Sequence, residues 1–249
     1  MVKQNFIVKH LVWIILLTCC CIAGCENKAD TSNAEGLKFY NKGKYGEAIL
    51  QFQKALELNP NHYDARFHLG ITYYVANRID EAIVELIKAI DINPKDPKAH
   101  YNIAFAYVTK EKVPEALIEY QKAIDLFAAN KDKREAEAYL YKAVAYSLIE
   151  KHDEAFAACR KSIELNPQTE DGHYFLGVCY YKKNMFDDAI VEFKKVVSIN
   201  PKSEKAHSLL FTIYDKLGRG EEATEEDRII KQLAQERRVK GFSEAPPPK

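Results

Sequence analysis

The sequence predicts an all-α protein, a solenoid of about six repeated two-helix units, and three observations carry this prediction. The dipeptide Asn-Pro recurs with its proline at residues 60, 94, 167 and 201, which gives spacings of 34, 73 and 34 residues. The segments that lead up to these prolines resemble one another, as Tyr45–Ile49 and Ile79–Ile83 show. Hydrophobic residues make up 47% of the 249-residue chain, which is enough to bury a sizeable core.

Small residues recur at the same interval and indicate where paired helices approach closely, because a larger side chain would push them apart. In the first helix of each unit they are Gly36, Gly70, Ala104, Ala143 and Gly177. In the second helix they are Ala48, Ala82, Ala116, Ala155, Ala189 and Ala223. The aromatic residues expected to fill the space between the helices are Phe39, Tyr73, Tyr107, Tyr146, Tyr180 and Tyr214.

This pattern resembles the tetratricopeptide repeat, a 34-residue unit of two antiparallel helices. The resemblance covers about 200 residues and implies a right-handed superhelical solenoid with units beginning near residues 29, 63, 97, 136, 170 and 204. We place this solenoid over residues 32–238, with a polar capping helix at its end, and a flexible tail over residues 239–249. The third unit lacks its proline, and five extra residues between Ala128 and Arg134 predict a lengthened loop.

Residues 1–24 have the layout of a secretory signal peptide, with Lys3 and Lys9 before an apolar run over residues 11–17. The segment ends in Ile22-Ala23-Gly24-Cys25, which resembles the lipobox of bacterial lipoproteins. The resemblance implies that Cys25 is lipidated and becomes the first residue, followed by a short tether over residues 25–31. The alternative is a soluble secreted protein that is cleaved nearby.

The lipobox resemblance implies a lipid-anchored protein of the bacterial cell envelope, whose contact with the membrane is the lipid on Cys25. Glu26 follows this cysteine in place of Asp, which in Gram-negative lipoproteins favours the outer membrane, and we expect the protein to face the periplasm. Lys+Arg and Asp+Glu both number 36 in the whole chain, so no overall field favours nucleic acid, and we expect no nucleic-acid partner.

The motifs of enzymes and metal sites are missing from the sequence: it holds no G-x-S-x-G, H-E-x-x-H, P-loop or G-x-G-x-x-G pattern. His173 and His207 occupy the same place in successive units, a whole two-helix layer apart, which is too far for one metal ion. We expect structural histidines, no catalytic residue, no metal and no cofactor. Cys159 and Cys179 are expected to be buried free thiols, with a disulfide as the alternative.

The family resemblance implies a concave groove formed by the first helices of the units. Apolar and aromatic residues at its lining positions predict a partner protein or peptide with apolar or aromatic side chains. The predicted groove residues are Phe67, Ile71, Tyr74, Tyr101, Phe105, Val108, Leu140, Val144, Leu148, Tyr174, Val178 and Tyr181. The alternative is that tight superhelical curvature or the chain's own tail covers this stripe.

The functional interpretation is a membrane-anchored scaffold or adaptor that binds other proteins and is not an enzyme. It looks similar to envelope lipoproteins that help assemble type IV pili, secretion pores or outer-membrane proteins. Self-assembly into a homo-oligomeric scaffold is the second hypothesis, and a peptidoglycan-related enzyme is the third.

Overall fold

The computed structural model describes residues 28–243, which form helices joined by turns and short loops, with no strand in this range. The chain divides into two compact units, one ending at Asn130 and the other beginning at Lys131. The predicted signal peptide, the lipobox cysteine and the last six residues lie outside the described range. None of the helices within residues 28–243 is both long and apolar enough to cross a membrane.

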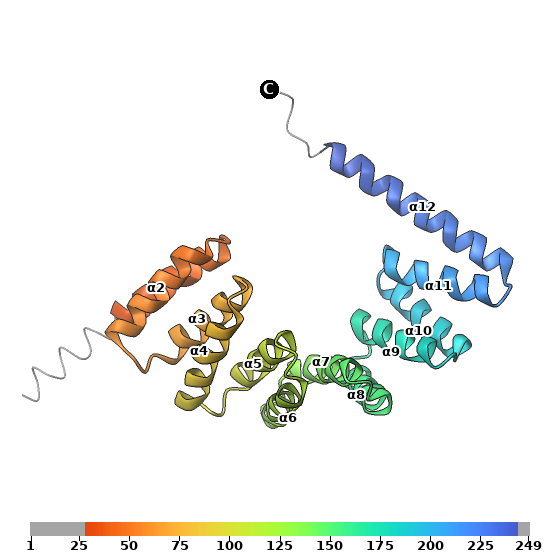
Figure 1. Cartoon of the computed structure of the whole chain (residues 1–249). Coiled ribbons are helices and arrows are strands. Elements are labelled where there is room, and N and C mark those ends of the chain that lie inside the picture. Colours follow the sequence, from red (N-terminus) through yellow and green to blue (C-terminus); the bar gives the residue numbers. More distant parts are fainter. Residues whose placement is uncertain (1–27, 244–249) are drawn as a thin grey trace, which may run out of the picture. The chain divides into compact units, whose positions relative to one another are not determined.

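The first unit consists of three helix pairs stacked in chain order, as the warm-coloured half of Figure 1 shows. A helix over residues 28–41 pairs with α2. The other helices pair in the order α3 with α4 and α5 with α6. The bounds are α2 (Tyr45–Leu58), α3 (Tyr63–Val75), α4 (Ile79–Ile92), α5 (Pro97–Thr109) and α6 (Val113–Ala129).

The second unit repeats this plan with three further pairs, α7 with α8, α9 with α10 and α11 with α12. The bounds are α7 (Arg134–Leu148), α8 (His152–Leu165), α9 (Glu170–Lys182), α10 (Phe186–Ile199), α11 (Glu204–Lys216) and α12 (Gly220–Ser243). The predicted fold, an all-helical solenoid of about six two-helix repeats, is thereby confirmed.

The predicted small residues lie where the two helices of a pair touch. A Cβ atom added to Gly36 would come within 2.5 Å of the Phe52 ring, and one added to Gly177 within 2.7 Å of the Phe193 ring. Both rings are fully buried, so neither can move aside freely. The six alanines of the second helices are also buried, which confirms their predicted role in close packing.

The recurring Asn-Pro dipeptide ends the second helix of a pair by a local mechanism. Asn59 and Asn200 are the C-caps of α2 and α10 and have extended backbones, which the following proline favours. Their Oδ1 atoms then accept hydrogen bonds from the backbone N–H groups of Asn61 and Lys202, at 3.0 and 3.1 Å. Each junction is therefore formed by the asparagine and the residues that follow it.

The turn inside each pair contains one residue in the left-handed region. Gly43 and Gly218 have φ angles of 70° and 69° and fill this place in the first and last pairs. The other four turns use residues with side chains, which are Asn77, Glu111, Glu150 and Asn184. Because a Cβ atom disfavours this conformation, the non-glycine residues pay a backbone cost at these turns.

Three predicted boundaries differ from the structure. Residues 28–31, expected in the tether, are helical, because Ala29 is fully buried in a cluster with Ala55 and Ala65. The extra residues near Ala128 form a loop only in part, since α6 continues to Ala129 where no proline stops it. Finally, α12 runs to Ser243, five residues into the segment expected as tail.

Candidate partner-binding groove

In the first unit, an aromatic cluster on α5 contains two of the predicted groove residues, Tyr101 and Phe105. The rings of Tyr101 and Phe105 meet edge to face with their centroids 5.0 Å apart, and both are half-buried. Both also lie edge-on to the buried ring of Tyr120 on α6, at 6.1 and 5.8 Å. Tyr120 therefore supports the pair from below and limits the rotamers that the two groove side chains can adopt.

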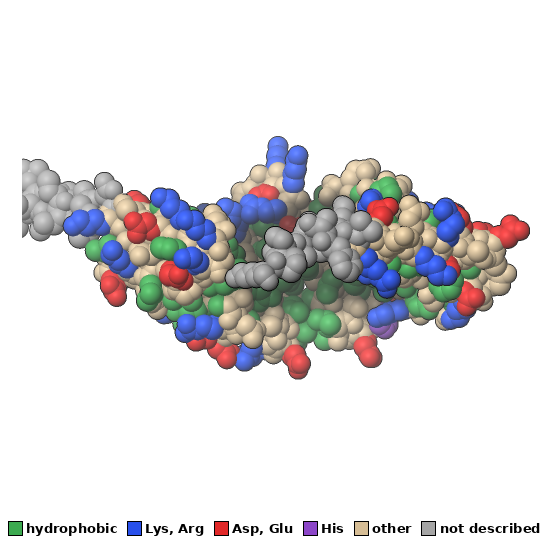
Figure 2. All heavy atoms as spheres, turned by 90° about the horizontal axis from the view of Figure 1, so that it is seen from above, with side chains coloured by type: hydrophobic (Ala, Val, Ile, Leu, Met, Phe, Trp, Pro, Cys, Tyr) green, Lys and Arg blue, Asp and Glu red, His purple; other side chains and the backbone are tan. Residues whose placement is uncertain are grey.

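The twelve predicted groove residues differ in how far they reach the surface. Phe67 and Leu140 are buried, with 8% and 7% exposure, so the expectation that they offer binding surface is wrong and they pack beneath it. Leu148 is 57% exposed, and the remaining nine are half-buried. Hydrophobic side chains also reach the surface among basic and acidic ones on the face drawn in Figure 2.

In the second unit, lysines from α11 lie over the aromatic side chains of the α9 region. Lys205 Nζ is 4.6 Å from the centroid of Tyr174, and it also pairs with Asp171 at 3.1 Å. Lys216 Nζ lies 5.8 Å from the Tyr181 centroid and 4.8 Å from that of Phe186. These contacts place positive charge at the rim of the aromatic surface, where it attracts the ring faces.

Two cavities of the second unit include predicted groove residues. The larger has a volume of about 300 Å³ and lies between α7 and the junction of α8 and α9, with Leu140 and Tyr141 in its wall. The smaller, about 120 Å³, is lined by Val178, Cys179 and Lys182 of α9. The wall of the larger cavity is mostly polar and charged, whereas the smaller combines apolar residues with the ammonium groups of two lysines.

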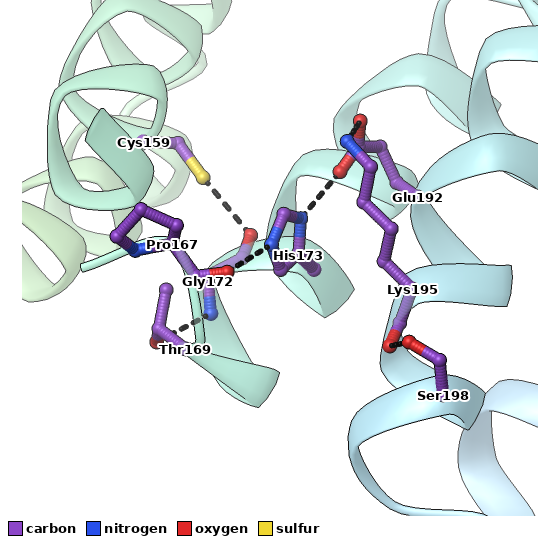
Figure 3. Close-up of polar contacts among 8 residues, drawn as sticks. All are labelled: Cys159, Pro167, Thr169, Gly172, His173, Glu192, Lys195 and Ser198. Carbon is purple, nitrogen blue, oxygen red and sulfur yellow. Dashed lines mark hydrogen bonds and ion pairs between the residues drawn. The ribbon is translucent and has the colours of Figure 1, made fainter.

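A polar arrangement that sequence reasoning did not find joins the repeats. Figure 3 shows His173 between two acceptors: its Nδ1 lies 2.6 Å from Glu192 Oε2, and its Nε2 lies 3.1 Å from the carbonyl oxygen of Pro167. Lys195 donates to the other oxygen of Glu192 at 2.9 Å. His173 is buried, so this set of contacts satisfies a polar side chain inside the pair.

The same arrangement recurs at equivalent positions. His100 contacts Glu119 and the Pro94 carbonyl at 2.6 and 3.0 Å. His207 contacts Glu226 and the Pro201 carbonyl at 2.5 and 3.2 Å. We call these three sets the histidine clamps. The structural role expected for these histidines is confirmed.

Arg66 takes the place of the histidine in an equivalent set of contacts. It stands at the equivalent position of an earlier repeat and donates to Glu85 and to the Pro60 carbonyl, at 2.7 and 2.6 Å. At His100 a carbonyl and an ionised carboxylate, which only accept hydrogen bonds, face the two ring nitrogens, so this imidazole serves both by donating from both nitrogens. Such an imidazole carries a positive charge, as arginine does.

The pKa shifts at His100 follow from these contacts. The hydrogen bond to Glu119 raises the pKa of His100, outweighing the opposite effect of burial. Burial alone would raise the pKa of Glu119, but hydrogen bonds from His100 and Lys122 bring that pKa below its usual value. Each partner therefore stabilises the charged form of the other.

The sequence held a signal for the clamps, which is a basic residue followed 19 residues later by glutamate. Arg66 and Glu85 show this spacing, and His100 and Glu119 repeat it. The fourth repeat breaks the pattern at both places: it has Tyr139 where the repeats of the clamps and of Arg66 have a basic residue, and an alanine at residue 158 where those repeats have glutamate. A spacing of this kind links two helices and becomes visible only when the repeats are aligned with one another.

Among residues 28–243, no group of three or more His, Cys, Asp or Glu side chains is placed to hold a metal ion. Cys159 and Cys179 are free thiols, and Cys159 donates to the carbonyl oxygen of Gly172 at 3.3 Å. The alternative of a disulfide between them is therefore not realised in this structure.

Comparison with known proteins agrees with this architecture. Tetratricopeptide-repeat models match residues 40–100, 136–169 and 170–203. A TPR repeat-containing protein of Borreliella burgdorferi is 47% identical over 45 residues. This match covers 18% of the chain and 20% of the relative, so the chain spans about a fifth of the curated protein it matches.

Solved structures extend the likeness over most of the chain. The structure of pilF of Pseudomonas aeruginosa covers 84% of this chain and 93% of its own, with a TM-score of 0.73 and 17% identity. PilW, a widely conserved type IV pilus biogenesis factor, covers 82% and 92%, with a TM-score of 0.72 and 19% identity. YrrB, a TPR protein with an unusual peptide-binding site, covers 73% and 91%, with a TM-score of 0.57 and 20% identity.

At these identities the solved structures show the fold, and the repeat models, which together match more than half of the sequence, show the family. The chain belongs to the tetratricopeptide-repeat family.

Proposed function

We propose that the protein is an adaptor that binds a peptide or protein segment in the groove of its first helices. The observation that carries this proposal is the aromatic cluster of α5, where Tyr101 and Phe105 are half-exposed and held in place by buried Tyr120. A rigid aromatic surface loses little conformational entropy on binding, which suits it to anchor apolar side chains of a partner.

A segment bound by the second unit should present apolar or aromatic side chains, with acidic groups tolerated beside them. Lys205 and Lys216 lie at the rim of the α9 aromatic residues, and Lys182 lines the smaller cavity. A carboxylate of the partner near these ammonium groups would gain attraction, whereas a basic group would be repelled.

The proposal places the adaptor in the bacterial cell envelope, anchored by lipid on Cys25 and facing the periplasm from the outer membrane. The lipobox-like end of residues 1–25 and Glu26 support this placement. The likeness to PilW, a type IV pilus biogenesis factor, supports a role in assembling an envelope machine. The likeness to YrrB, with its peptide-binding site, supports a peptide as ligand.

The experiment is a crosslinked pull-down from intact cells, read out by mass spectrometry. It compares wild type, Cys25→Ser, and the double variant Tyr101→Ala with Phe105→Ala. We expect the double variant to lose the partner while its helix content by circular dichroism stays near wild type, and Cys25→Ser to release the protein from membranes.

A control variant, Val191→Ala, removes a 52% exposed aliphatic side chain on α10 and should keep the partner. Capture unchanged in the groove variant would move the binding site elsewhere. Self-crosslinks alone, unaffected by the groove change, would instead favour the homo-oligomeric scaffold. A catalytic activity that a single polar substitution abolishes would revive the peptidoglycan-related enzyme.

A further inference from the structure

The outer helices of the first unit carry an exposed aliphatic row that the groove does not use. Leu50 on α2, Val84 on α4 and Ile118 on α6 are 65%, 48% and 58% exposed. They are separated by 34 residues each and so occupy the same position in three successive repeats. Single exposed aliphatic residues are ordinary, but one at the same position in each of these three repeats forms an ordered surface.

Charged side chains accompany the row in the same order on each helix. Four residues after each aliphatic residue stands a lysine, and seven residues after it an acid, which places all three on one helix face. The acids are Glu57, Asp91 and Asp125. We call the aliphatic residues and these acids together the outer strip.

The lysines do little to neutralise this face. Lys88 is bound to Glu85 and Lys122 to Glu119, each at 2.7 Å, so two of the three lysines are already engaged. In the part of the chain that the structure describes, neither Glu57 nor Asp91 has an ion-pair partner. Helices α2, α4 and α6 together hold nine acidic residues, of which five are paired with a basic side chain. The acids of the strip, Glu57, Asp91 and Asp125, are not among these five, so they are the carboxylates of this face that stay open to a basic partner.

The second unit lacks this combination. The equivalent positions of the aliphatic row hold Ala157, Val191 and Glu225, of which only Val191 is a large apolar residue. Its outer helices α8 and α10 are closer to neutrality, with three acidic and two basic residues each, histidine not counted. The strip is therefore a property of the first unit and not of the repeat in general.

We propose that the outer strip of the first unit is a second docking surface, which takes a basic amphipathic segment of a partner protein. Apolar side chains of the segment would cover Leu50, Val84 and Ile118, and lysines or arginines beside them would face Glu57, Asp91 and Asp125. An 18-residue helix is about 27 Å long, more than twice the diameter of about 10–12 Å of a single helix, so it can reach beyond one of these helices. The charge of the strip opposes an anionic membrane surface as the occupant.

The test uses a fluorescent 18-residue helical peptide with leucines on one face and lysines on the other, titrated by anisotropy. The protein is the chain from residue 26, which holds every helix and contact described above. The strip variant is Leu50→Ser, Val84→Ser and Ile118→Ser combined, and the matched control is Val191→Ser with Leu165→Ser in the second unit. All five are exposed, at 40% or more, so the fold should persist, which circular dichroism checks.

We expect the strip variant to weaken peptide binding at least tenfold and the control to stay within twofold of wild type. Replacing Glu57, Asp91 and Asp125 by their amides should weaken binding and flatten its dependence on salt. A peptide with glutamates in place of the lysines should bind at least tenfold more weakly to the wild type.

Equal binding by the strip variant and wild type would overturn the proposal, as would equal binding of the glutamate peptide. A wild-type dimer in sedimentation equilibrium that the strip variant abolishes would also overturn it, because the occupant would then be a second copy of the chain. The groove variant Tyr101→Ala with Phe105→Ala should keep peptide binding. Failure of the groove proposal therefore leaves this one standing, and the reverse holds.

Discussion

His100 is fixed between two acceptors, with Nδ1 2.6 Å from Glu119 Oε2 and Nε2 3.0 Å from the carbonyl oxygen of Pro94. Because its pKa is raised above the usual 6.5, its contribution to stability is fully present below that value and is lost as the pH rises through the folded-state pKa. The lowered pKa of Glu119 adds a contribution that is lost as the pH falls below its usual range.

We therefore predict that the protein is most resistant to urea at mildly acidic pH and weakens over the interval above pH 6.5, as the pH rises through the folded-state pKa of His100. The variant His100→Arg should lose about 1 kcal/mol less of unfolding free energy over this interval, because arginine keeps its charge, as Arg66 does. Urea midpoints of both proteins at pH 6 and 9 provide the measurement. Parallel pH profiles would show that His100 does not carry a charge in the folded protein.

Gly177→Ala should destabilise the second unit by about 1–3 kcal/mol, because the new methyl group would overlap the buried ring of Phe193. Gly46→Ala is the matched control, since Gly46 lies in α2 with no atom within 4 Å of the new Cβ, and alanine favours helix by about 1 kcal/mol. Thermal unfolding should therefore shift in opposite directions for the two variants. If Gly177→Ala left the unfolding temperature unchanged, α9 and α10 would be able to move apart and take up the methyl group without loss of stability.

Glu111→Gly should stabilise the first unit by about 0.5–1 kcal/mol, because Glu111 has a φ of 59° where its Cβ atom is disfavoured. Gly43→Ala, at a φ of 70° in the equivalent turn, should destabilise by a similar amount. Urea unfolding followed by circular dichroism measures both. A loss of stability in Glu111→Gly would show that the added freedom of the unfolded chain outweighs the relieved strain.

Cys159 and Cys179 should react slowly with iodoacetamide at pH 8 in the native protein. Burial raises the pKa of both thiols, which lowers the thiolate fraction that reacts. Peptide mapping by mass spectrometry before and after unfolding in urea gives the rate at each site. A disulfide-linked peptide from protein isolated under oxidising conditions would contradict the free thiols of the structure.

Much of the fold could be predicted because the residues that pack between helices recur at the repeat period. Gly36, Gly70 and Gly177 mark close helix contacts, and each proves to face a buried side chain of the partner helix. Asn-Pro also marks helix ends, because the asparagine side chain bonds to the backbone of a residue that follows directly. The loop that the five extra residues near Ala128 predict is only partly present, because without a proline to end it α6 continues to Ala129.

The candidate site was less predictable, because exposure depends on the neighbouring repeat. Phe67 and Leu140 share the positions of groove residues yet are buried by their surroundings. The histidine clamps join residues 19 apart with a carbonyl six residues earlier, and the period alone does not reveal such a contact. Leu50, Val84 and Ile118 were visible as a period of 34, but only the structure shows that no other helix covers them.

The asparagine that ends α2, α4, α8 and α10 also bears on how such a chain can grow. Asn93, like Asn59, makes its turn with residues that follow it directly, accepting from the backbone of Lys95 at 3.3 Å. Duplication of one 34-residue stretch of the gene would therefore also duplicate the turn that connects it to the next repeat. The number of repeats can change between descendants without redesign of the helices on either side, and a longer chain would offer its partner a longer surface.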